Sequence, residues 1–164
     1  MTIENAESQQ EMAKILGRIP SGLAIMTARL DQRETGLLVS WMQQCSFEPP
    51  QITVALRQGR EVLGWLEPGS PFVVNLIAEG QNHFLSHFGK GFTLDQPAFE
   101  GLEVEREGEF PPILSSALGY LQCRVASRIP TGDHELVVGT IIAGRMLQSQ
   151  ARPWTHVRKT GLRY

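Results

Sequence analysis

The sequence has only two cysteines in 164 residues, Cys45 and Cys123. They lie far apart and neither belongs to a Cys-x-x-Cys pair, which argues against a zinc site or a disulfide framework. Isolated thiols of this kind usually behave as small apolar residues, so we expect both cysteines to be buried. No metal site is predicted.

The sequence also has no excess of charge of either sign. Fifteen lysines and arginines stand against seventeen aspartates and glutamates, which gives a net charge of -2. Proteins that bind nucleic acid or anionic membranes carry a surplus of basic residues. Both classes of partner are therefore disfavoured.

Long hydrophobic runs are missing as well. No apolar stretch approaches the roughly 20 residues that span a membrane, and the first ten residues are polar and acidic, unlike a signal or transit peptide. We therefore expect a cytoplasmic protein, in which a flexible N-terminus (residues 1–10) precedes a single domain (residues 11–164). A chain of this length buries roughly 70% of the surface that its unfolded form exposes, which is enough for one core.

Several nucleotide-binding and catalytic motifs do not occur. Gly89 and Gly91 lack the third glycine and the preceding strand of a Rossmann fingerprint, and there is no Walker A sequence. His83 and His87 are four residues apart, but the glutamate of a zinc protease helix is absent between them. No Gly-x-Ser-x-Gly elbow is present either. A hydrolase is disfavoured, and a nucleotide would need another kind of site.

Short apolar runs make up most of the sequence, and 16 glycines and 10 prolines separate them. This pattern is typical of a β-rich barrel rather than a helical bundle. Strands are predicted at 21–30, 51–57, 71–77, 119–129 and 134–144. The runs at 71–77 and 134–144 are almost continuously apolar, which predicts burial on both faces, whereas 119–129 alternates between a packed and a polar face.

Three short helices are predicted within residues 11–19, 59–69 and 79–91. In the third, Phe84 and Phe88 stand four residues apart and should share one face. The proline-bearing, acidic stretch 93–112 is predicted to be a long surface loop.

The segment Ser40–Phe47, "SWMQQCSF", carries the clearest functional signal. It follows an apolar run and combines hydroxyl and amide groups with one tryptophan. A flavin needs such a mixed surface, with a flat apolar contact for its ring and hydrogen-bond partners for its polar edge. The alternative is a strand end that turns polar at the surface, with Trp41 filling the barrel.

A series of segments adds to this interpretation: "GLLVSWMQQCSFEPPQITVAL", "PFVVNLIAEG", "HFLSHFGKGF", "ALGYLQCRV", "GDHELVVGTI" and "HVRKTGLRY". In this order they resemble the flavin reductase-like family of FMN-binding split barrels, over nearly the whole chain from about Gly17. The resemblance is greatest to the flavin reductase module at the C-terminus of cyanobacterial-type flavodiiron proteins. It implies a mainly β fold, an FMN-binding split barrel with short flanking helices.

The resemblance also implies which residues bind the flavin. In that family the segment matching Ser40–Phe47 wraps the ring and ribityl chain, the next linker meets the phosphate, and a Phe-containing helix end flanks the cofactor. The predicted residues are Ser40, Trp41, Met42, Gln43, Ser46, Phe47, Arg60, His87, Phe88 and Lys90. Gln43 departs from the small residue usual in the family. For the phosphate the linker offers Arg57 and Arg60, and Arg60 is preferred because it stands just before a predicted helix.

His134 lies in a Gly-Asp-His sequence, and from the residues alone it is either a turn residue beside Asp133 or a functional histidine. The family places the matching histidine beside the reactive face of the flavin and the nicotinamide, so the resemblance implies a catalytic, nicotinamide-binding His134. The basic C-terminal stretch adds Arg158 and Tyr164 as nicotinamide-binding residues. Its alternative role is to tie down the end of the chain.

The predicted function is an NAD(P)H-dependent flavin reductase, in which a hydride passes from nicotinamide to FMN or FAD and electrons continue to a partner protein or another acceptor. Two alternatives stay open: a split-barrel oxidase that uses FMN without nicotinamide, and a non-catalytic flavin-binding or dimerisation module. The resemblance implies a homodimer. Flavodiiron proteins also contain a diiron domain and a flavodoxin-like domain, which do not fit in 164 residues. Oxygen or nitric oxide reduction by this chain alone is therefore not predicted, and the initial Met1 favours a stand-alone reductase.

Overall fold

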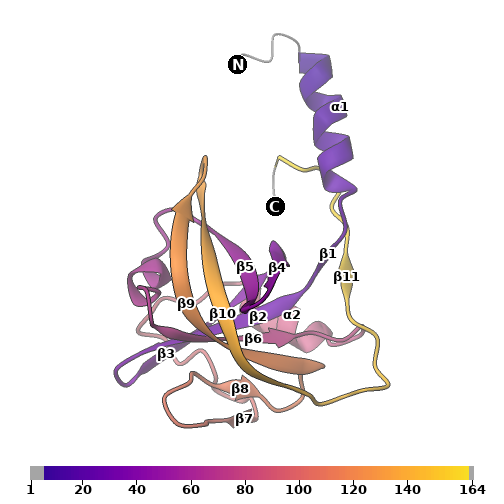
Figure 1. Ribbon diagram of the computed structural model, residues 1–164. Helices are drawn as coiled ribbons and strands as arrows, with labels where there is room; N and C mark the ends of the chain where they lie inside the picture. The colour runs from indigo at the N-terminus through magenta and orange to yellow at the C-terminus, as the bar shows by residue number, and fades with distance from the viewer. Residues whose placement is uncertain (1–5, 163–164) are drawn as a thin grey trace.

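The computed structural model describes residues 6–162 of the chain, and strands hold far more of them than helices. The predicted mainly β fold is therefore confirmed. In chain order the elements are α1 (Ala6–Gly17), β1 (Ser21–Gly22), β2 (Ala24–Leu30), β3 (Arg33–Val39), β4 (Met42–Phe47), β5 (Pro50–Arg57), the 3-10 helix η1 (Glu61–Trp65), β6 (Pro71–Leu76), α2 (Asn82–Phe88), β7 (Val104–Glu105), β8 (Ile113–Leu114), β9 (Gly119–Pro130), β10 (His134–Met146) and β11 (Thr155–His156). Figure 1 shows a strongly curved sheet with α1 standing to one side of it.

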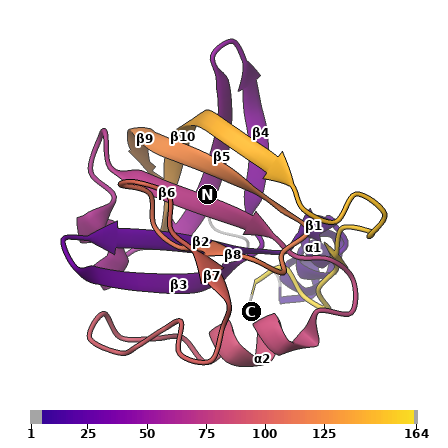
Figure 2. The same cartoon turned by 90° about the horizontal axis from the view of Figure 1, so that it is seen from below.

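One antiparallel sheet of seven strands forms the body of the molecule, in the order β3-β2-β6-β9-β10-β5-β4. β3 and β4 follow each other in the chain but lie at opposite edges of this sheet, and only Ser40 and Trp41 join them. A two-residue link covers three Cα steps, so the two edges stand within roughly 11 Å of each other at this point. The sheet therefore curls into a barrel that is split beside β3 (Figure 2).

Apolar side chains from alternate strand positions fill the barrel. The alternation predicted for β5 is confirmed, because Ile52, Val54 and Leu56 are all buried. β6 is buried on both faces, as its continuous apolar run predicts. The short helix η1 adds Val62 and Trp65 to the same core, and this also agrees with the sequence.

β10 differs from the prediction, because its second half is exposed although the apolar run predicts burial on both faces. The side chains of Ile142 and Met146 are 54% and 61% exposed. The cause is the length of the neighbouring strand: β5 pairs with β10 only as far as Thr140, so the rest of β10 has β9 alone as a neighbour. Apolar character alone did not reveal this difference in strand length.

The predicted polar face of β9 is not in contact with solvent along its first half. Tyr120 and Gln122 on that face are buried, with exposures of 7% and 6%. The segment between α2 and β8 runs past this face, and the Gln122 amide donates a hydrogen bond to the Glu107 carboxylate at 2.9 Å. The segment that packs over β9 therefore buries a strand face that the alternating sequence pattern predicts to be exposed to solvent.

That segment, residues 93–112, is largely exposed, as predicted, and two buried polar side chains attach its end to the sheet. The Thr27 hydroxyl donates to the carbonyl oxygen of Pro112 at 2.7 Å. The Asn75 side chain donates to the Ile25 carbonyl at 3.1 Å and accepts from the Leu114 amide at 2.8 Å. Among the described residues, every buried side-chain nitrogen and oxygen has a hydrogen-bond partner.

The helices agree with the sequence in part. In α2, Phe84 and Phe88 are both buried against β2 and β3, as their spacing predicts, and Figure 2 shows α2 alongside β3. In contrast, α1 begins at Ala6, so the predicted boundary at residue 10 falls inside this helix. Residues 1–5 lie outside the described part of the chain.

The two cysteines differ from each other, which corrects the expectation that both are buried. Cys123 lies in the barrel core, and burial raises the pKa of its thiol to about 12. Cys45 is exposed, at an irregularity in the pairing of β4 with β5 between Gln44 and Ser46. β4 is an edge strand in a projecting hairpin, and an apolar residue type does not guarantee burial there.

Glu34 of β3 accepts hydrogen bonds from two arginines that reach it from different parts of the chain. Arg29 of β2 donates at 2.7 Å, and Arg106 of the 93–112 segment donates to the other carboxylate oxygen at 2.8 Å. Partial burial raises the pKa of Glu34, but the hydrogen bonds and charges of both arginines outweigh it and lower the pKa below the ordinary 4.5. The charged form of Glu34 therefore stabilises the attachment of this segment.

The Glu34→Gln substitution is expected to lower the free energy of unfolding by about 1–2 kcal/mol at neutral pH, because it removes charge-assisted hydrogen bonds. A carboxyl with a lowered folded-state pKa contributes stability above its unfolded pKa and loses it as the pH falls. The difference from the wild type should therefore shrink below about pH 4.5 in urea unfolding experiments. Glu48→Gln, in the exposed turn between β4 and β5, is the matched control. An unchanged difference at acid pH would contradict the role of the charge.

Candidate functional site

A cavity of about 1050 Å³ lies at the split of the barrel. Its walls come from β3, the Ser40–Trp41 link, the end of β5, the start of η1, the end of α2 with the loop that follows, and residues 156–160. Ligand pockets usually measure about 300–1,000 Å³. The cavity is therefore large enough for a nucleotide-sized molecule.

The cavity combines an apolar floor with a positively charged rim. Its floor includes the buried side chains of Leu37, Val39, Leu56, Val62 and Phe88. Basic residues at its edge are Arg57, Arg60, Lys90, Arg158 and Lys159, and Glu61 is the acidic residue among them. A flat apolar group with an anionic tail matches this distribution, since apolar surface is buried below and phosphate charge is compensated at the rim. These features fit a flavin nucleotide.

Trp41 occupies the point where the chain crosses from one edge of the sheet to the other. Its carbonyl accepts a hydrogen bond from the Ala55 amide of β5 at 2.8 Å, which fixes the link against the opposite edge. The guanidinium of Arg158 stands over the indole ring at 4.9 Å from its centroid, within cation–π range. The ring of His134 also lies close to the indole, with the two centroids 4.8 Å apart and the planes tilted by 43°.

A second, smaller cavity of about 190 Å³ adjoins the first. Trp41, Arg57 and Arg158 line both cavities, and the smaller one adds Asp133 and His134. His134 and Arg57 are direct cross-strand partners on β10 and β5, so their side chains emerge together at the ends of these strands. The wall between the two cavities is therefore built from Trp41 and two arginines.

His134 is buried and is held by its neighbour in the sequence. Its Nδ1 lies 2.7 Å from a carboxylate oxygen of Asp133, whose side chain is 81% exposed. The hydrogen bond with His134 lowers the pKa of Asp133 below the ordinary 3.8. Asp133 is consequently ionised at neutral pH and accepts the hydrogen bond, so Nδ1 of His134 carries a proton. The β9–β10 turn is closed by the Thr131 hydroxyl, which donates to the His134 carbonyl.

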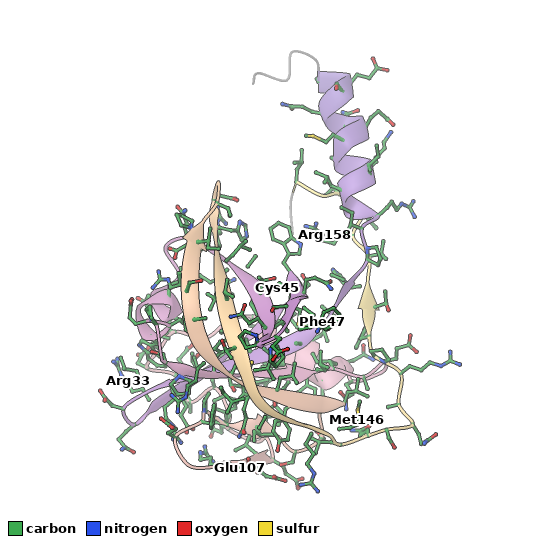
Figure 3. The ribbon with its side chains drawn as sticks, viewed as in Figure 1. Arg33, Cys45, Phe47, Glu107, Met146 and Arg158 are labelled. Carbon is green, nitrogen blue, oxygen red and sulfur yellow. The ribbon has the colours of Figure 1, made fainter. Side chains whose placement is uncertain are left out.

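Of the residues predicted from the sequence, seven lie at these two cavities. Ser40, Trp41, Arg60, Phe88, Lys90 and Arg158 line the larger one, and His134 lines the smaller one. Figure 3 shows Arg158 between the barrel and the lower end of α1.

The other predicted residues lie elsewhere. Met42 packs against the barrel core, and Gln43, Ser46 and Phe47 follow β4 away from both cavities. Phe47 is 88% exposed at the tip of the β4–β5 hairpin, which projects beyond the other strands (Figure 2). His87 turns to the segment after α2, where its Nε2 lies 2.8 Å from the Ala98 carbonyl oxygen. Tyr164 lies outside the described residues.

Sequence reasoning missed the loop after α2, which contributes Phe92 and Leu94 to the cavity wall. The signal that was available is the glycine pair at the end of the helix. Gly91 has a φ of 74°, a conformation that other residues rarely adopt, and it turns the chain back over the cavity.

The described part of the chain contains no group of three or more His, Cys, Asp or Glu residues arranged to hold a metal ion, and no helix with the length and apolar character of a membrane span.

A split barrel with an apolar, cation-rimmed cavity beside a buried histidine is compatible with a flavin reductase-like protein, and the comparison with known families shows that family. The model of the flavin reductase like domain matches residues 16–161, so the chain belongs to this family. The resemblance seen in the sequence is confirmed at this level.

Several curated relatives are diflavin flavoproteins. The chain is 36% identical over 155 residues to putative diflavin flavoprotein A 3 of Nostoc and, over the same length, to diflavin flavoprotein A 1 of Synechocystis. Each match covers 94% of this chain but 27% of the relative. The chain thus spans about a quarter of the length of these proteins.

Solved flavin reductases share the fold. The NADH:FAD oxidoreductase SgcE6 of Streptomyces globisporus has a TM-score of 0.81 at 17% identity, over 96% of this chain and 92% of that one. The styrene monooxygenase flavin reductase SMOB of Pseudomonas putida has a TM-score of 0.75 at 24% identity, over 88% and 90%. At this level of identity the likeness concerns the split-barrel fold.

Proposed function

We propose that this chain is an NAD(P)H-dependent flavin reductase that binds FMN or FAD in the larger cavity. The observation that carries the proposal is the shared Trp41 wall, which sets a nucleotide-sized cavity directly beside a smaller one containing a buried histidine. Membership of the flavin reductase-like family supports it. Two proteins of similar fold also support it, since SgcE6 was solved with NAD and FAD fragments and HpaC with NADP+.

The binding residues have distinct tasks in this proposal. The buried side chains of Leu37, Leu56 and Phe88 would contact the apolar ring and exclude water from it. Arg60 and Lys90 at the rim would hold the phosphate, because a fixed positive charge at the edge of an apolar cavity favours an anion there. FMN is the expected cofactor, and FAD is the alternative.

When bound, the flavin supplies the acceptor for a hydride from the nicotinamide. The chain mainly orients the two ring systems, and Trp41 and Arg158 border both positions. His134 would face the nicotinamide from the smaller cavity, in an orientation fixed by Asp133. His134 acts as an orienting and electrostatic residue in this scheme, and no general acid–base pair is required.

The proposal extends to a homodimer. Phe47, Ile142 and Met146 are exposed large apolar side chains on the β4–β5 hairpin and on the half of β10 that pairs with β9 alone. The register brings these regions together, because Phe47 pairs with Pro50 and Thr140 with Gln51. A second copy that covers them would remove apolar surface from water. A monomeric mass in analytical ultracentrifugation at micromolar concentration would exclude this dimer.

Onward delivery of electrons to a partner protein stays part of the same proposal, as does a cytoplasmic location. The activities of the much longer diflavin flavoproteins are not assigned to this chain, which spans only about a quarter of their length.

The direct test is the spectrum of purified protein loaded with FMN or FAD under anaerobic conditions. Addition of NADH or NADPH should bleach the oxidised flavin band within seconds to minutes, because a nicotinamide stacked on the flavin ring, with His134 at its edge, transfers its hydride directly. A yellow protein that neither nucleotide bleaches would instead indicate an FMN oxidase. Protein that takes up no flavin would indicate a non-catalytic module.

His134→Ala is expected to slow flavin reduction by NAD(P)H about tenfold. The effect is modest because the substitution removes an orienting group and not an essential acid. The Kd for flavin should stay within about twofold, since His134 does not line the larger cavity. Stopped-flow absorbance and fluorescence titration measure the two quantities. The matched control is His83→Ala, an exposed histidine of α2 that borders neither cavity. An unchanged reduction rate would remove His134 from the mechanism.

A further inference from the structure

α1 stands apart from the barrel (Figure 1). Within the described residues, no side chain of α1 belongs to any of the buried apolar clusters. Ile15 is 68% exposed, and only Ala13 and Gly17 of the helix are buried. Support of the barrel therefore does not account for this helix.

The burial of α1 comes from the C-terminal segment, defined here as residues 155–162. The Gly161 amide donates to the Ala13 carbonyl at 2.7 Å, and the Arg158 amide donates to the Gly17 carbonyl at 2.9 Å. Carbonyls in the last turn of a helix have no partner within the helix, and the C-terminal segment supplies one to Gly17. The contact thus joins the two ends of the described chain.

Two glycines allow the backbones to approach each other this closely. A Cβ on Gly17 would stand 2.8 Å from the Arg158 carbonyl oxygen, closer than real Cβ atoms come. A Cβ on Gly161 would overlap the Cβ of Leu16 and stand 2.9 Å from the Leu16 carbonyl carbon. Gly161 does not have a positive φ, so the obstacle to a larger residue is the contact and not the backbone conformation.

The opposite side of the C-terminal segment faces the site. Its first two residues form β11, which pairs with β1, and residues 156–160 line the larger cavity. Arg158 lies in the middle of this stretch. Its amide donates a hydrogen bond to the Gly17 carbonyl, while its guanidinium covers the ring of Trp41, which lines both cavities. One residue therefore connects the helix to the site.

We propose that α1 and the C-terminal segment form a clasp that positions Arg158 at the wall shared by the two cavities. The chemistry of this inference rests on the proposed function: the guanidinium would meet the diphosphate of the pyridine dinucleotide that enters beside His134. Gly17, which borders neither cavity, is then a positioning residue that acts through Arg158, and Gly161 holds the segment against α1 while also lining the smaller cavity. An opened clasp lets the segment move away, while the barrel and the apolar floor stay in place.

Limited trypsin digestion tests the clasp without flavin or activity, because Arg158 and Lys159 are cleavage sites inside the segment. Gly161→Ala is expected to speed the release of residues 160–164 about tenfold, because cleavage requires local opening of the segment. Mass spectrometry measures the released peptide over time. The matched control Gly64→Ala adds a Cβ that meets no atom within 4 Å, so its cleavage rate should equal that of the wild type. The thermal unfolding midpoint should change little in both variants, because the core is untouched.

A milder variant covers the case in which Gly161→Ala does not fold. Leu16→Ala keeps the Cβ that lies against Gly161 and a good helix former, but it removes the rest of a half-buried side chain of α1, and it should speed the same cleavage about threefold. If neither Gly161→Ala nor Leu16→Ala changes the cleavage rate, the clasp is refuted.

The link from clasp to site is tested by steady-state kinetics. Gly17→Ala, whose added Cβ would meet the Arg158 carbonyl oxygen at 2.8 Å but which borders neither cavity, should speed the trypsin cleavage as Gly161→Ala does. Gly17→Ala and Arg158→Gln should each raise the KM for NAD(P)H about tenfold with kcat changed less than twofold, the pattern of lost binding that is equal in the ground and transition states. Arg158→Gln keeps the amide bond to Gly17, so cleavage after Lys159 should stay at the wild-type rate. An unchanged KM with faster cleavage overturns the positioning role. Absence of any NAD(P)H oxidation in the wild type refutes the proposed function instead, and leaves the trypsin result to decide on the clasp.

Discussion

The two-residue link between β3 and β4 is the constraint on which the rest of the structure depends. Ser40 and Trp41 join strands at opposite edges of one sheet, so the sheet can exist only if it curls until those edges nearly meet. The two edge strands approach each other there without pairing, which leaves the barrel split, and the larger cavity lies at this split. The fold and the site therefore have the same cause, and Trp41 is a wall residue because of its place in the topology.

The chemistry of the site follows from what this geometry brings together. His134 and Arg57 are cross-strand partners at the ends of β10 and β5. The link between β3 and β4 places the indole of Trp41 beside His134. Apolar strand positions that face the split form the floor, while loops and the chain end bring basic residues to the rim. A site assembled in this way suits a cofactor that carries its own reactivity, because the protein needs only to orient it and compensate its charge.

Much of the fold could be predicted from the sequence, because local patterns govern it. The alternation of β5 and the Phe84–Phe88 pair of α2 both reflect local periodicity, and both were correct. What could not be predicted depends on partners distant in the sequence. Cys45 is exposed because its hairpin projects, and the second half of β10 is exposed because β5 ends early. Likewise, the sequence indicates that Ser40–Phe47 is unusual, but only the pairing of β4 shows that Gln43 and Phe47 leave the cavity.

The pairing of α1 with the C-terminal segment has a consequence for how the molecule assembles. Ala13 and Gly161 are separated by nearly the whole chain, and closing so long a loop costs more entropy than any hairpin in the barrel. Contacts of high sequence separation also form late on average. We therefore expect the barrel to form first during folding and to provide most of the resistance to denaturation. The contact between α1 and the C-terminal segment should form last, so that the chain becomes stable before its binding surface is complete.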